Sequence, residues 1–205
     1  MSSASDVIAV TITADILAAD DNGISTDAAV GNNAALTIAG ALADGGSVTL
    51  SNARKVTITS AGDDSGISFT IVGTDINGTA QTESLTGADT GVATSSKFFL
   101  TIASITAVGD PAANVKAGIS ADSSSIVYSG RSRLKGVFLT STATAGTVDF
   151  LNTSTAGTSL MKISSVASAT ATRDVVIPEN GVLFTDGIYI QYTVSTFLTL
   201  TVFHA

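Results

Sequence analysis

Residues 67–86 read ISFTIVGTDINGTAQTESLT, and this stretch decides the fold class. Two runs of alternating apolar and polar residues, 67–73 and 79–86, flank the turn sequence Asp-Ile-Asn-Gly at 75–78. Alternation is the pattern of a strand with one buried face, and Asn-Gly between two such runs is a strong hairpin signal. The same turn lacks the ligand spacing of a calcium loop. The stretch therefore predicts an antiparallel β-hairpin.

The turn type sets the register of this hairpin. A two-residue type I′ loop would place Phe69 opposite Thr86, whereas a type I turn followed by a left-handed glycine places Phe69 opposite Leu85. Asp75 at the first turn position and Gly78 at the fourth favour the second arrangement. We therefore expect Gly78 at positive φ.

The favoured register also sorts the side chains of the hairpin by polarity. It gathers Ile67, Phe69, Ile71 and Leu85 on one face, and a slip of one residue would move Leu85 to the hydroxyl-bearing face. Glu83 falls on the apolar face opposite Ile71, so we expect it near the open edge of the core.

Strand-like alternation recurs along the chain, separated by clusters of Gly, Asn, Asp and Ser. Beyond the hairpin, the predicted strands are residues 7–13, 35–38, 47–50, 55–60, 98–108, 115–119, 134–141, 147–151, 160–164, 173–177, 182–184, 187–193 and 197–203. Only residues 14–20 and 33–42 could form short turns of helix, because β-branched residues and glycine crowd the rest. The pattern predicts an all-β chain with little helix, built from β-sandwich or barrel-like domains.

A polar run divides the chain. Residues 121–125 read Ala-Asp-Ser-Ser-Ser within a stretch, 120–130, that ends in glycine, as linkers often do. Charge changes at the same place: through residue 127 there are 13 acidic and 4 basic side chains, and from residue 128 there are 4 acidic and 5 basic. We predict an acidic N-terminal β-domain, residues 1–125, and a C-terminal β-domain, residues 126–205, joined by a short polar linker.

Composition removes several classes of function. Cysteine is absent and His204 is the single histidine, so a nucleophile–base pair or a soft-metal site has few possible members. We expect no enzymatic activity, catalytic residue, metal or cofactor, and we expect His204 to be exposed or at a subunit contact. A net charge of −8 argues against nucleic-acid binding. No apolar run approaches the ~20 residues of a spanning helix, and the N-terminus does not resemble a secretory signal.

Arg131, Arg133 and Lys135 form the one unusual charge pattern. In an extended chain, residues two apart share a face, so the three cations should line one side of a strand. Two interpretations remain open. The cations could protect a solvated edge strand from aggregation, or they could form a partner interface that docks on an acidic surface such as the first domain of a neighbouring copy.

Residues 56–70 read VTITSAGDDSGISFT and continue into Gly-Thr-Asp-Ile-Asn-Gly at 73–78 and Gln-Thr-Glu at 81–83. This segment, within residues 47–110, resembles small Thr/Ala/Gly-rich virion proteins of tailed bacteriophages. The resemblance implies a capsid- or tail-associated β-protein with no catalytic residues.

We therefore expect a structural protein of the phage virion, made in the host cytoplasm. The favoured role is a capsid decoration (cement) protein that binds the major capsid protein or other virion proteins as a homotrimer or other homo-oligomer. The alternatives are a head–tail, neck, tail or short-fibre component, and then a carbohydrate-binding or adhesin-like β-sandwich.

Overall fold

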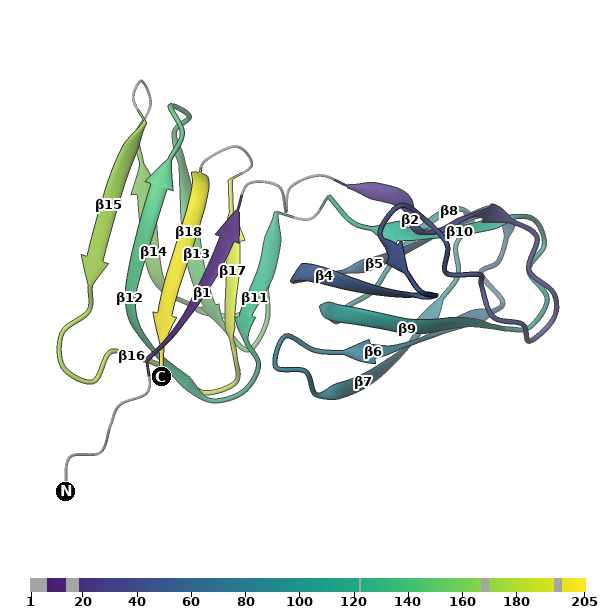
Figure 1. The fold of residues 1–205 in the computed structure, drawn as a ribbon, viewed down its shortest axis with the longest axis horizontal. Coiled ribbons are helices and arrows are strands. Elements are labelled where there is room, and N and C mark those ends of the chain that lie inside the picture. Colours follow the sequence, from purple (N-terminus) through teal and green to yellow (C-terminus); the bar gives the residue numbers. More distant parts are fainter. Residues whose placement is uncertain (1–6, 14–18, 122, 167–169, 194–196) are drawn as a thin grey trace. The chain divides into compact units, whose positions relative to one another are not determined.

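The computed structural model describes residues 7–13, 19–121, 123–166, 170–193 and 197–205. This part of the chain contains strands and turns but no helix, and its strands form four antiparallel sheets (Figure 1). The predicted all-β class is confirmed. The chain divides into two compact units, of which one combines strand β1 with the chain from Ser123 onward and the other contains the chain between them. We call them the terminal unit and the middle unit.

The terminal unit is a β-sandwich of sheets A and D. Sheet A runs β1 (Ile8–Thr13), β18 (Phe197–His204), β12 (Ser132–Ser141) and β15 (Ala171–Val176), with β16 (Val182–Phe184) also paired to β12. Sheet D runs β11 (Ser124–Tyr128), β17 (Ile188–Tyr192), β13 (Gly146–Asn152) and β14 (Ser159–Ser165). One buried cluster joins the inner faces: Ile12, Leu139 and Leu200 come from sheet A, and Phe150 and Ile190 from sheet D.

The middle unit repeats this architecture with sheets B and C. Sheet B runs β2 (Asp20–Ala28), β10 (Val115–Ile119), β5 (Val56–Asp63) and β8 (Asp89–Thr94). Sheet C runs β3 (Ala43–Asp44), β4 (Ser47–Arg54), β9 (Phe99–Val108), β6 (Ser68–Thr74) and β7 (Ala80–Thr86). Its core again draws on both sheets, with Ile24 and Ile58 from sheet B and Phe69 and Ile105 from sheet C.

The predicted domain boundary is close to the observed one, but its assignment of the first strand is wrong. The chain passes between the units at Ser123, whereas β1 belongs with the C-terminal residues. β1 pairs with β18 over six residues, from Ile8 opposite His204 to Thr13 opposite Thr199. The two ends of the chain therefore complete one sheet, which a division into consecutive sequence blocks cannot represent.

Several further expectations about local structure need correction. Residues 124–128 of the predicted linker form β11, in which Ser124 and Ser125 are buried. Neither β2 nor β8 was predicted as a strand. Residues 33–42 form no helix, and the expected strand 35–38 makes only one bridge, Ala35 to Thr106. Of the other possible helical turn, residues 14–18 lie outside the described part.

The hairpin at residues 67–86 has the predicted register. Phe69 lies opposite Leu85, the N–H of Asp75 donates to the carbonyl oxygen of Thr79 at 2.9 Å, and Gly78 has a φ of 79°. Glu83 lies on β7, at the edge of sheet C, where its carboxylate accepts hydrogen bonds from the backbone N–H groups of residues 96 and 97 and from the Ser96 hydroxyl. The carboxylate at the open edge of the core is thus satisfied by a neighbouring loop.

Candidate functional site

The three predicted interface cations lie at the start of β12. Arg131 is exposed in the bend before the strand, and Arg133 and Lys135 alternate along it with buried Ser132 and Leu134. Arg133 and Lys135 therefore share the outer face of sheet A, as the spacing predicted. β12 is not an edge strand, however, because β18 flanks it on one side and β15 and β16 on the other. The edge-protection interpretation is wrong.

Two of the three cations have a local structural role. An Nη1–H of Arg133 donates to the carbonyl oxygen of Asn180 and the Nζ of Lys135 donates to that of Glu179, both at 3.2 Å. These bonds fasten the turn between β15 and β16, in which Glu179 has a φ of 55°. Within the described part of the chain, Arg131 makes no hydrogen bond or ion pair. Arg131 is therefore the exposed member of the trio with no such local role, although bonds to neutral carbonyl oxygens leave the charges of Arg133 and Lys135 in place.

The outer face of sheet A beyond these cations is a regular array of small hydroxyl-bearing side chains with an apolar strip. Cross-strand pairing arranges its outward side chains in three rows: Thr13, Thr199, Thr140 and Thr172; then Thr11, Thr201, Phe138 and Asp174; then Ala9, Phe203, Gly136 and Val176. Val176 is 77% exposed and Phe138 is 40% exposed. This face thus presents large apolar side chains to solvent on an otherwise polar surface.

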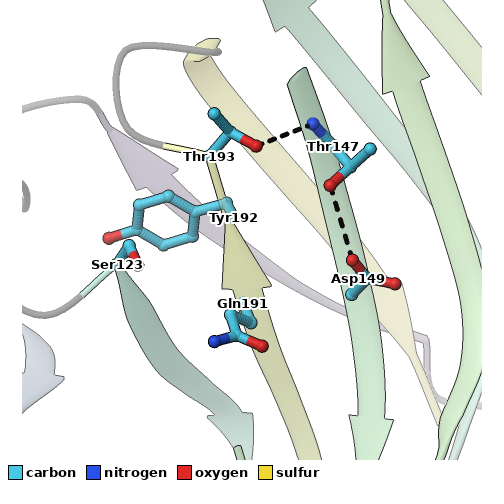
Figure 2. Close-up of a pocket in the computed structure, with 6 residues that line it drawn as sticks. All are labelled: Ser123, Thr147, Asp149, Gln191, Tyr192 and Thr193. Carbon is cyan, nitrogen blue, oxygen red and sulfur yellow. Dashed lines mark hydrogen bonds between the residues drawn. The ribbon is translucent and has the colours of Figure 1, made fainter.

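A polar groove lies on the outer face of sheet D, in the same unit. Figure 2 shows the six residues that line this hollow of about 260 Å³: Ser123, Thr147, Asp149, Gln191, Tyr192 and Thr193. Adjacent strands supply most of them, because Asp149 on β13 lies directly opposite Gln191 on β17. No local sequence pattern marks this groove, because its residues come together only through strand pairing.

The carboxylate of Asp149 is held on several sides. Its Oδ1 accepts a hydrogen bond from the Ser159 hydroxyl at 3.0 Å and forms an ion pair with the Nζ of Lys162 at 3.1 Å. Its Oδ2 faces the Thr147 hydroxyl at 3.5 Å, a contact that Figure 2 marks with a dashed line. The side chain of Asp149 is 16% exposed, whereas that of Lys162 is 56% exposed. The groove therefore contains a fixed, mostly neutralised acceptor.

His204 is buried, which contradicts the expectation of an exposed or subunit-contact residue. It retains 2% of its accessible surface, with its ring 4.9 Å from that of Tyr128 and its Nδ1 3.1 Å from the Ser132 hydroxyl. Burial lowers the pKa of His204. Ser132 is itself buried and donates to the carbonyl oxygen of Ala205. This Ser–His contact is a core hydrogen bond with no access for a substrate.

Comparisons with protein-family models, curated protein sequences and solved structures found no significant match to this chain. The described residues contain no group of three or more His, Cys, Asp or Glu side chains placed to hold a metal ion. A search of the same residues for a helix long and apolar enough to cross a membrane found none.

Proposed function

We propose that this protein is a non-enzymatic structural protein of a tailed-phage virion, a capsid decoration protein that binds the assembled shell in many copies. The observation that carries the proposal is the outer face of sheet A. Exposed apolar side chains clustered on a polar surface are typical of protein–protein contacts. The Val176 and Phe138 side chains, set among threonines, offer such a contact without any chemistry.

Charge supports a partner with an acidic surface. The middle unit, Ala18–Asp122, has 11 acidic and 4 basic side chains, a net of −7, while the remainder of the chain has 6 acidic and 5 basic, a net of −1. Arg131 adds an exposed cation beside the outer face of sheet A. Complementary charge raises the rate of association and selects among partners. An acidic shell subunit, or the middle unit of a neighbouring copy, has the complementary sign.

Copy number per particle is the decisive measurement. A stained gel of purified virions that contains this protein in amounts comparable to the major shell protein supports decoration of the shell. A copy number of six, twelve or a few trimers identifies a head–tail, neck, tail or fibre component instead. Absence from purified virions refutes the virion assignment altogether. Light scattering of the isolated protein tests the expected homotrimer or other homo-oligomer.

A pair of matched variants tests whether the proposed face is the contact. Val176→Thr removes the most exposed apolar side chain on sheet A, and Leu160→Thr makes the same kind of change on sheet D, where Leu160 is 38% exposed. Both substitutions should change the free energy of unfolding by no more than about 0.5 kcal/mol. Only Val176→Thr should weaken co-sedimentation with particles. Equal effects of the two variants would exclude the sheet A face.

A further inference from the structure

The polar groove lies on the opposite side of the sandwich from the proposed docking face, because sheets A and D enclose one core. Four of its six lining residues, Thr147, Asp149, Gln191 and Thr193, belong to two rows that cross sheet D. One row is Ser124, Gln191, Asp149 and Lys162, each directly opposite the next on adjacent strands. The second row is formed by Thr193, Thr147 and Ser164. A contact made through sheet A would leave this groove open.

The charges of the groove favour an uncharged ligand. The Nζ of Lys162, 3.1 Å from the Asp149 carboxylate, largely neutralises that carboxylate, so the pair attracts neither an anion nor a cation strongly. The groove has no second carboxylate among its lining residues, whereas hard cations require six or more oxygen ligands. The groove can therefore bind a ligand mainly by hydrogen bonds from neutral ligand groups, with the Asp149 carboxylate as a fixed acceptor.

The groove offers both donors and acceptors at short range. The Gln191 amide is exposed and supplies one acceptor oxygen and two donor hydrogens. Asp149 supplies an acceptor whose orientation Ser159 and Lys162 already fix, so little conformational entropy is lost when a ligand binds. The Tyr192 ring packs in the core against Phe197, so polar groups line most of the groove.

We propose that this groove binds a neutral saccharide through one sugar ring. Vicinal hydroxyls both donate and accept, which matches a carboxylate and an amide on adjacent strands. The volume of about 260 Å³ lies just below the ~300–1,000 Å³ range of ligand pockets, so it holds one ring and not an extended chain. The shallow, water-exposed contact gives weak affinity for a single sugar, with a Kd of roughly 1–10 mM.

Saturation-transfer NMR with the full-length protein tests the proposal. The probes are four neutral sugars (glucose, galactose, mannose and N-acetylglucosamine), together with anionic N-acetylneuraminic acid and cationic glucosamine. At least one neutral sugar should bind saturably, and more tightly than both charged sugars. Tyrosine emission provides a second readout, because Tyr192 directly follows Gln191 in β17.

Three variants locate the binding. Gln191→Ala removes an exposed amide that makes no hydrogen bond within the described part of the chain, so it should leave folding intact and weaken binding by about fivefold or more. Asp149→Asn should weaken binding further. Asp174→Asn, the same change on the outer face of sheet A, is the matched control and should have no effect.

Three results would overturn the proposal. The first is the absence of saturable binding of any neutral sugar up to roughly 50 mM, well above the expected Kd. The second is binding that Gln191→Ala and Asp149→Asn leave unchanged, and the third is tighter binding of a charged sugar. None of these results bears on the assembly proposal, which depends on sheet A and on copy number.

Discussion

Replacing Ile12 with alanine should destabilise the terminal unit, although Ile12 and the body of that unit are more than a hundred residues apart in the sequence. Ile12 is fully buried in the cluster that sheets A and D share. Isoleucine-to-alanine changes in cores cost about 2–5 kcal/mol. β1 is an edge strand whose surroundings can partly relax, so we expect about 2–3 kcal/mol. With a urea slope near 1.5 kcal/mol per M, the midpoint should fall by roughly 1.3–2 M.

The chain carries its own probe for this measurement. It has no tryptophan, and its three tyrosines, Tyr128, Tyr189 and Tyr192, all belong to the terminal unit. Tyrosine emission therefore follows the unfolding of that unit. Far-UV circular dichroism follows both units. Urea titrations recorded with the two signals separate the transitions of the two units wherever their midpoints differ.

Ile24→Ala is the matched control for Ile12→Ala. Ile24 lies only 12 positions later and is equally buried, but in the core of the middle unit. Replacing Ile24 should leave the midpoint of the tyrosine-detected transition unchanged. It should lower the urea midpoint of the middle unit, which circular dichroism follows. A tyrosine transition that does not respond to Ile12→Ala would refute the assignment of β1 to the terminal unit. It would instead favour a domain formed by residues 1–125.

Three further perturbations follow from single sites. Gly78→Val should lower the free energy of unfolding by about 1–3 kcal/mol through backbone strain at positive φ, as measured by urea titration with circular dichroism. Gly66→Val is the control, because Gly66 has similar open space but no positive φ, and it should cost less. Burial lowers the pKa of His204, so the unfolded state binds a proton more readily than the folded state. The free energy of unfolding should therefore rise with pH from that lowered pKa to about 6.5 and then level off. His204→Gln should remove this pH dependence in melts followed by tyrosine emission. Arg131→Ser should weaken particle association and flatten its salt dependence while folding stays intact. Replacing Arg133 and Lys135 with serine should in addition lower the free energy of unfolding by about 1 kcal/mol, because both side chains hold the β15–β16 turn. Particle binding that keeps its salt dependence without Arg131 would count against the charge-based docking.

Local signals predicted the hairpin at residues 67–86 correctly, down to the pairing of Phe69 with Leu85. Both strands and the turn lie within twenty residues there, so turn chemistry and alternation act on the same contacts. The polar composition of β11 and β2 concealed these strands, because Ser124 and Ser125 in β11 and Ser25 within β2 are buried polar residues. Burial of small hydroxyls breaks the alternation from which strands are recognised.

By itself, the sequence determined the all-β class, most of the strands and the division near residue 123, since each depends on residues close together in the chain. Only the tertiary structure decided that β1 closes sheet A, that β12 is internal, and that Asp149 and Gln191 share a groove. The physical reason is the strand ladder. Its hydrogen bonds join backbone groups that every residue except proline carries, so the choice among distant partners depends on the burial of whole faces and not on any local motif.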